Sequence, residues 1–101
     1  MSAEVLQFRP RPRADSAEAL GALFGAVQAA RRHCEHANVA WAISARQSLR
    51  EALAAHAWPL ATRHRLGQVL THLDRLDAAG ALRELRGLER DLAAGQRGAA
   101  A

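Results

Sequence analysis

The fold is decided by residues 20–56, which read LGALFGAVQAARRHCEHANVAWAISARQSLREALAAH. At 100° per residue, one line along a helix collects most of the apolar side chains of this stretch, and the phase persists to Leu53 without a reset. This apolar stripe consists of Leu20, Leu23, Phe24, Val27, Cys34, Trp41, Ala45, Leu49, Ala52, Leu53 and His56. The pattern predicts one amphipathic helix over residues 16–57, about 63 Å long.

Two large apolar residues conflict with one straight helix. Val39 and Ile43 lie off the apolar stripe. A kink or break near Asn38 is therefore the alternative to a continuous helix, and the sequence leaves both open. Pro59 ends this segment, because proline disrupts a helix interior, and it begins the next one, because proline is favoured at a first helical position.

Two shorter helices follow Pro59. Over residues 60–79 a second stripe consists of Leu66, Val69, Leu70, Leu73 and Leu76, and Gly80 is expected to end that helix. A third stripe, closed by Gly95, consists of Leu82, Leu85, Leu88 and Leu92. The short junction at residues 77–80 predicts an antiparallel hairpin. We therefore expect an all-α fold, in which a long amphipathic N-terminal helix packs against a C-terminal helical hairpin to form a three- to four-helix bundle.

The composition supports helices, and the chain ends differ from the centre. Alanine supplies 25 residues and leucine 14, whereas valine, isoleucine and threonine together supply seven, a balance that favours helices over sheets. Residues 9–13, RPRPR, predict an extended segment. Asp15 is expected to cap the first helix, with Glu18 at capping-box spacing. The predicted division is an extended tail at 1–14, a helical bundle domain at 15–95 and a frayed C-terminal tail at 96–101.

The centre of the apolar stripe is polar for two turns, where Arg31, Glu35 and Asn38 share its face. One interpretation is a contact zone that fixes the register of a partner helix; the other is that the helix ends here and these residues are solvated. Trp41 lies on the stripe and is most simply part of the core. Trp58 either caps the end of the bundle or anchors a partner, because tryptophan is enriched at binding hot spots. These five residues are the partner-binding candidates.

The net charge of +4 is divided between the tail and the rest of the chain. In the first fourteen residues three arginines outweigh one glutamate by +2, and in the remainder eleven arginines outweigh nine acidic residues by +2. Arg32, Arg46 and Arg50 fall within a sector of about 40° on the predicted long helix, a stripe that could follow phosphates. The near balance of the folded part and the lack of aromatic stacking residues disfavour nucleic-acid binding. Nucleic-acid binding through this arginine stripe and the basic tail remains the alternative function.

His33, Cys34 and His36 are weak candidates for a metal or thiol-sensing site, because imidazole and thiolate both bind zinc. Within one helix, Cys34 points about 100° away from His33, and no second close Cys/His pair follows. The single cysteine excludes an intramolecular disulfide framework. The chain also has no phosphate-binding glycine loop and no metalloprotease helix motif, so we expect neither an enzyme nor a cofactor.

The remaining expectations concern partners and location. Val5, Leu6 and Phe8 precede the arginine–proline segment and form a candidate docking element for another protein's groove or sheet edge. The sequence leaves open that this segment folds back on the bundle or stays disordered. The longest nearly apolar stretch, residues 19–30, is too short for a membrane span, which needs about 20 residues. We expect a cytoplasmic, bacterial, non-enzymatic module for protein–protein interaction, an oligomerising adaptor, regulator or chaperone-like subunit, with a protein partner or a second copy as its ligand.

Overall fold

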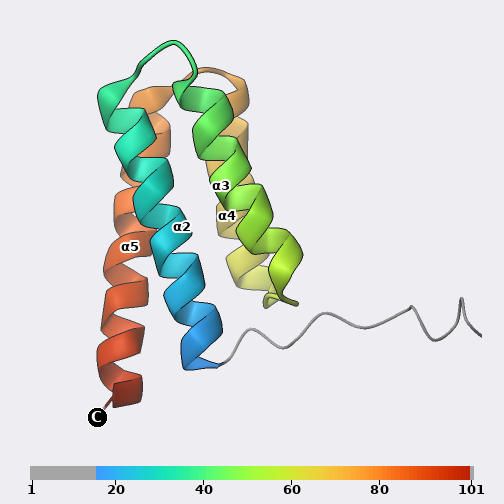
Figure 1. The fold of residues 1–101 in the computed structure, drawn as a ribbon, viewed down its shortest axis with the longest axis vertical. Coiled ribbons are helices and arrows are strands. Elements are labelled where there is room, and N and C mark those ends of the chain that lie inside the picture. Colours follow the sequence, from blue (N-terminus) through green and yellow to red (C-terminus); the bar gives the residue numbers. More distant parts are fainter. Residues whose placement is uncertain (1–15, 101) are drawn as a thin grey trace, which may run out of the picture.

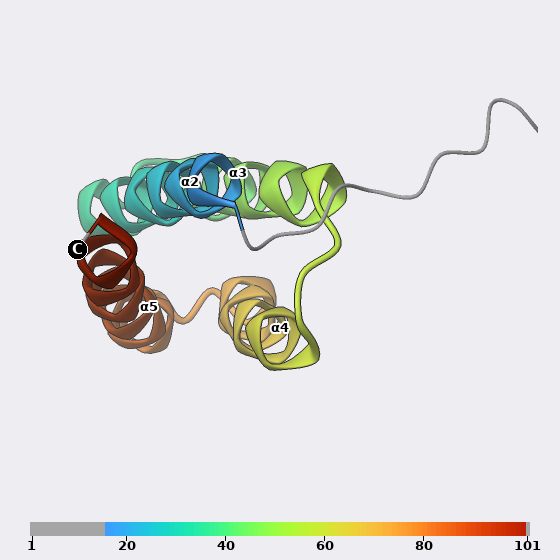
Figure 2. The same ribbon diagram turned by 90° about the horizontal axis from the view of Figure 1, so that it is seen from below.

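A computed structural model describes residues 16–100, with side chains for residues 16–95. Its helices are α2 (Ala17–His36), α3 (Trp41–Ala55), α4 (Leu60–Asp74) and α5 (Ala78–Ala100), and this part of the chain contains no strand. Successive helices run in opposite directions (Figure 1). Seen along the bundle, α2 and α3 form one layer and α4 and α5 the other (Figure 2). The all-α bundle prediction is confirmed, in its four-helix form.

The predicted continuous N-terminal helix is wrong, and its alternative, a break near Asn38, is correct. The chain reverses over residues 37–40, where Ala37 adopts a left-handed backbone (φ 48°) and donates its N–H to the His33 carbonyl at 3.0 Å. One long helix would leave half of the apolar stripe without a partner. Because the chain folds back, Val27 on α2 and Leu49 on α3 both enter one core.

The connection between α4 and α5 also differs from the prediction. Helix α4 ends at Asp74, and Leu76 takes the left-handed conformation (φ 55°). The N–H of Leu76 donates to the Leu73 carbonyl at 3.1 Å and that of Asp77 to the His72 carbonyl at 2.8 Å, the two hydrogen bonds of a Schellman motif. Gly80 therefore does not end the second helix, because Gly80 already lies in the first turn of α5.

Gly80 is important because it lacks a side chain, and not because it adopts an unusual backbone conformation. The Asp77 carboxylate caps α5, since its Oδ1 accepts the Gly80 N–H at 2.9 Å, while its Oδ2 contacts His72 Nδ1 at 3.0 Å. A Cβ atom on Gly80 would stand 2.5 Å from His72 Nδ1. The glycine therefore lets the histidine and the capping carboxylate lie against the first turn of α5.

Two predicted helix boundaries need correction. The N-cap of α2 is Ser16, whose hydroxyl accepts the Ala19 N–H at 3.1 Å, and not Asp15. Helix α5 does not end at Gly95 but continues to Ala100. The division into a tail, a domain and a frayed end otherwise stays a prediction.

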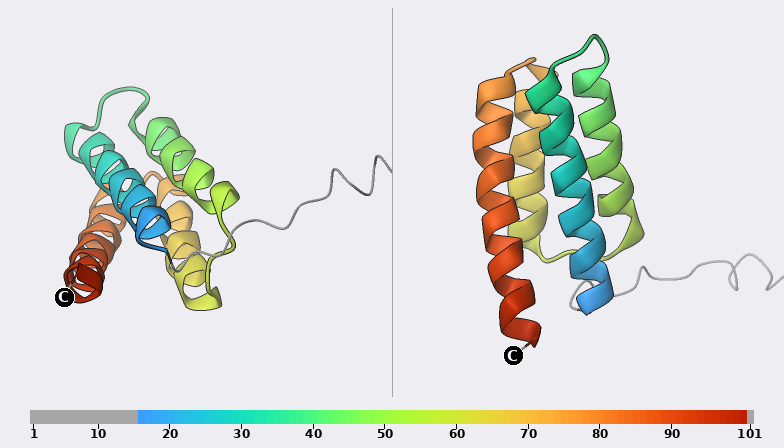
Figure 3. Two further views of the ribbon diagram at one scale, coloured as in Figure 1. Left: turned by 60° about the horizontal axis from the view of Figure 1, so that its bottom comes forward. Right: turned by 60° about the vertical axis from the view of Figure 1, so that its left-hand side comes forward.

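The core lies between the two layers. Its buried members are Ala19, Leu23, Val27, Ala30, Cys34, Ala45, Leu49, Trp58, Leu66, Val69, Leu73, Ala81, Leu85 and Leu88. Helix α2 packs extensively on both α3 and α5, whereas α3 and α4 pack least extensively of the neighbouring pairs (Figure 3). An ion pair between Arg46 and Asp74 joins α3 to α4. The α3–α4 side is therefore the least tightly closed side of the bundle.

Candidate functional site

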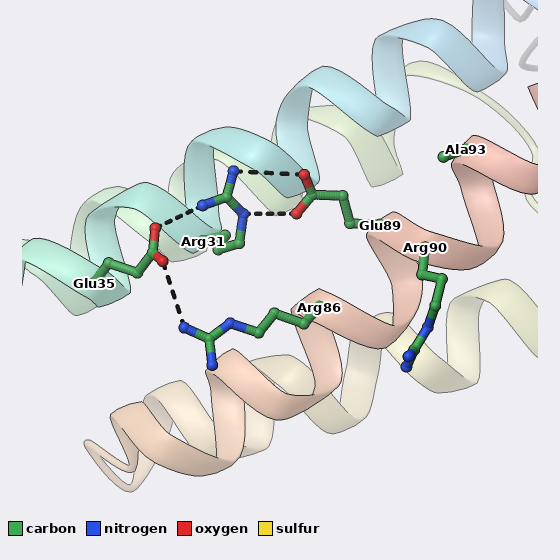
Figure 4. Close-up of a pocket in the computed structure, with 6 residues that line it drawn as sticks. All are labelled: Arg31, Glu35, Arg86, Glu89, Arg90 and Ala93. Carbon is green, nitrogen blue, oxygen red and sulfur yellow. Dashed lines mark hydrogen bonds and ion pairs between the residues drawn. The ribbon is translucent and has the colours of Figure 1, made fainter.

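Four of the charged side chains form a network between α2 and α5. Figure 4 shows the Arg31 guanidinium between two carboxylates. Its Nε donates to Glu89 Oε2 at 2.6 Å and its Nη1 to Glu35 Oε1 at 2.6 Å. Glu35 Oε2 accepts from Arg86 Nη2 at 3.4 Å. The alternating charges therefore join two helices whose residues are more than fifty positions apart in sequence.

The positive and negative charges of this network neutralise one another. The hydrogen bond with Glu89, more than any other influence, raises the pKa of Arg31 above its ordinary value, and the negative charges of Glu89 and Glu35 act in the same direction. An open depression of about 410 Å³ adjoins the network. Because each of the two carboxylates already has an arginine partner, the arrangement fixes α2 against α5 instead of preparing a general acid or base.

Sequence reasoning identified half of this network. For Arg31 and Glu35 the sequence left two interpretations open, a zone that fixes the register of a partner helix and a solvated helix end. In the structure both lie in the last turns of α2, and the helix they contact is α5 of the same chain. Arg86 and Glu89 were missed. They are three residues apart and so share one face of α5, a signal that was present, but nothing in their spacing says that this face meets α2.

The other partner-binding candidates lie apart from this network. Asn38 is exposed in the α2–α3 connection, where its Oδ1 accepts the Ala40 N–H at 3.2 Å. Trp41 is half-buried against the core. Trp58 is only 5% exposed, and its indole N–H donates to the Ala52 carbonyl at 2.8 Å. Of its two predicted roles, Trp58 therefore caps the end of the bundle and is not free to anchor a partner.

The histidine–cysteine segment forms no metal centre in the described part of the chain, where no three His, Cys, Asp or Glu side chains gather. Cys34 is 2% exposed, on the core side of α2. Burial, and to a smaller extent the negative charge of Glu35, raise the pKa of this thiol. His36 is exposed in the last turn of the helix. The thiol is therefore disfavoured as a thiolate, which is the form that binds metals and reacts.

The three arginines of the predicted stripe are not aligned along one helix, because the chain forms α2 and α3 instead of one long helix. Arg32 belongs to α2, whereas Arg46 and Arg50 belong to α3, which runs in the opposite direction. Arg32 Nε donates to the Gln28 carbonyl at 3.4 Å, and Arg46 is paired with Asp74. The prediction that these arginines form a continuous phosphate-binding line along one helix is therefore wrong.

The predicted docking element cannot be placed. Val5, Leu6 and Phe8 lie outside the described residues.

One end of the bundle carries exposed apolar side chains that sequence reasoning did not select. Val39, in the α2–α3 connection, is fully exposed, Ile43 in the first turn of α3 is 72% exposed, and Leu76 in the α4–α5 connection is 69% exposed. We call these three residues the end patch. Both connections lie at the same end of the molecule (Figure 1). The signal for Val39 and Ile43 was their position off the apolar stripe, whereas Leu76 was wrongly assigned to the core.

Leu76 is unusual in two respects. Its position after the end of α4 requires the left-handed backbone that glycine or asparagine normally supplies, and a residue with a Cβ pays about 1–2 kcal/mol to adopt it. Its large apolar side chain gains little burial in return. Strained residues of this kind cluster at functional sites.

In comparisons with known proteins, no family model, no curated protein and no solved structure matches this chain. None of the described helices is long and apolar enough to span a membrane. The case for a function therefore depends on the geometry of this chain alone.

Proposed function

We propose that this chain is a non-enzymatic helical module that binds another protein through the end patch. The observation that carries this proposal is Leu76, which is both strained and exposed. A partner that buried this side chain would contribute about 1.5–3 kcal/mol, enough to offset the cost of its backbone. Without such a contact, glycine would suit the position better.

Val39 and Ile43 add further exposed apolar surface for such a partner. A buried apolar centre with a polar rim is the usual anatomy of a protein interface. The end patch supplies three exposed apolar side chains at one end of the bundle. Arg46 and Arg50 lie further along α3, and Arg75 lies directly after α4. A second copy of the chain is the alternative occupant, and it would make the module a homo-oligomer.

Binding, rather than catalysis, is favoured by the state of the charged groups. Between residues 16 and 95 the largest gathering of charges consists of mutually paired arginines and glutamates. A catalytic site would instead hold a group whose shifted pKa serves proton transfer. The groups here with shifted pKa values are the ion-paired Arg31, the buried Cys34 and Asp77, which caps α5.

The test compares two leucine variants of the full chain. Leu76→Asn keeps a residue that tolerates the left-handed backbone but removes the apolar side chain. Leu60→Asn is the matched control, because Leu60 is 73% exposed at the start of α4, at the opposite end of that helix. Quantitative affinity capture should recover at least one protein, or a second copy, with the unchanged chain and the Leu60 variant but not with the Leu76 variant. Equal recovery by both variants would contradict the proposal.

A further inference from the structure

Arginines flank the end patch, and they bear on the chemistry of its partner; the inference therefore rests on the proposed function. Arg50 on α3 and Arg75 directly after α4 are both exposed. Among the described side chains, no carboxylate forms an ion pair with either arginine. Each guanidinium is thus free to donate to a carboxylate of another molecule, with which arginine forms strong bidentate hydrogen bonds.

Of the acidic residues nearest in sequence to these arginines, Asp74 is neutralised by an ion pair, Asp77 contacts His72 and lies near Arg83, and Glu51 is hydrogen-bonded but not ion-paired. Asp74 pairs with Arg46 across the α3–α4 side, and Glu51 accepts a hydrogen bond from Gln47 Nε2 at 3.2 Å. The neutral amide of Gln47 leaves the negative charge of Glu51 in place. On this side two exposed arginines without an ion pair, Arg50 and Arg75, therefore outweigh one glutamate, and the excess charge is positive.

A shallow depression leads from the end patch along the outer face of α3. It has a volume of about 350 Å³ and is lined by Ile43, Arg46, Gln47, Arg50 and Glu51. Ile43, Gln47 and Arg50 follow the spacing of one helix face, so the depression runs along the axis of α3. It begins at an apolar side chain, Ile43, and ends at Arg50 and Glu51. A second helix laid along α3 fits this shape, whereas the depression is too open to enclose a small molecule.

We infer that the end patch and the outer face of α3 bind an acidic amphipathic helix of a partner protein. Its apolar side chains cover Val39, Ile43 and Leu76, and its carboxylates meet Arg50 and Arg75. A second copy fits less well, because it would bring the same arginines to the interface, and like charges across an interface disfavour association.

A peptide selection tests the inference directly. Random 16-residue peptides displayed on phage are selected on the immobilised full chain, and in parallel on the Arg50→Glu/Arg75→Glu double variant. The unchanged chain should enrich peptides with apolar residues at helical spacing and an excess of Asp and Glu. The double variant should enrich the same apolar spacing with Lys and Arg instead. An exchange of charge preference is an outcome that a purely structural role of the two arginines would not produce.

A quantitative measurement follows with the most enriched acidic peptide, made synthetically. Its Kd should rise about tenfold in the double variant and also with added salt, since charges at the rim of an interface act through screened electrostatics. The control is Arg63→Glu/Arg90→Glu, which changes the net charge equally at exposed positions outside the patch and its depression. This control should leave the Kd within twofold. Far-ultraviolet circular dichroism confirms that all variants stay helical.

The outcomes distinguish a failure of the proposed interaction module from a failure of the acidic partner. Enrichment of neutral or basic peptides by the unchanged chain overturns the acidic partner but keeps the proposed interaction module. No enrichment relative to Leu76→Asn overturns both. A doubled solution mass that falls to that of the monomer in Leu76→Asn assigns the patch to a second copy and overturns the acidic partner. Competition by a 20-base-pair duplex DNA at the same patch overturns it in favour of nucleic acid.

Discussion

The two helix connections at the patch end of the bundle, α2–α3 and α4–α5, both reverse the chain but are stabilised by different hydrogen bonds. Each contains a non-glycine residue with a left-handed backbone, Ala37 after α2 and Leu76 after α4. The α4–α5 connection is closed by a Schellman motif and by the Asp77 cap. The α2–α3 connection has one side-chain hydrogen bond, which Asn38 Oδ1 accepts from the Ala40 N–H. The side chain at the strained position is a methyl group in one connection and a leucine in the other. Reversal of the chain therefore does not require a large side chain there, and Leu76 needs another explanation.

The largest expected effect tests whether α3 faces the core through Leu49 and solvent through Ile43. Leu49→Ala should lower the free energy of unfolding by about 2–5 kcal/mol, because Leu49 is fully buried where α3 lies on α2. Ile43→Ala, on the exposed face of the same helix, should change it by no more than about 0.5 kcal/mol. Urea unfolding followed by circular dichroism measures both. Equal losses would mean that α3 does not pack on α2 through this face.

A smaller effect on the free energy of unfolding is expected at the two positions with a left-handed backbone. Ala37→Gly and Leu76→Gly should each raise the free energy of unfolding by up to about 1 kcal/mol, since glycine adopts the left-handed backbone freely and the gain is partly lost to its unfolded-state entropy. Only Leu76→Gly should abolish partner capture. A variant that is more stable and yet inactive in binding would separate function from folding. A Leu76→Gly chain that still binds its partner fully would remove Leu76 from the interface.

The smallest effect is a pH dependence confined to the second connection. The hydrogen bond from the Gly80 N–H, and next that from His72, lower the pKa of Asp77 below its ordinary value. The stabilisation by this carboxylate is therefore fully present above the unfolded-state pKa of an aspartate and is lost as the pH falls through the lowered native value. Unfolding measured from neutral to acidic pH should show this loss in the unchanged chain. Asp77→Asn keeps an acceptor for Gly80 but should lack the contribution; an identical pH profile would refute it.

The sequence predicted helices and their core faces well because periodicity reports burial directly. The apolar stripe has the correct phase in both α2 and α3, and Leu23, Val27 and Leu49 are all in the core. The sequence did not decide between a continuous helix and a break near Asn38, since neither glycine nor proline marks residues 37–40. The reversal is favoured by burial of the stripe, which is a property of the folded chain rather than of any local segment.

The candidate site was less predictable, for two physical reasons. Leu76 continues the spacing of the α4 stripe, but the helix ends two residues earlier, so its side chain no longer follows helical geometry. Glu89 meets Arg31 across 58 positions of sequence, and helical spacing reports only neighbours three or four residues apart. Glycine adds a further ambiguity, because Gly80 makes room for His72 where a helix end was expected.

The burial of Cys34 gives the molecule an internal reporter. Since it is the chain's single thiol and is 2% exposed, a water-soluble alkylating reagent reaches it only when the last turns of α2 separate from the core. The rate of that labelling then measures local opening beside the α2–α3 connection, without any introduced dye. A partner seated on the adjoining end of the bundle would slow the reaction, so occupancy can be followed by mass spectrometry on the unaltered polypeptide.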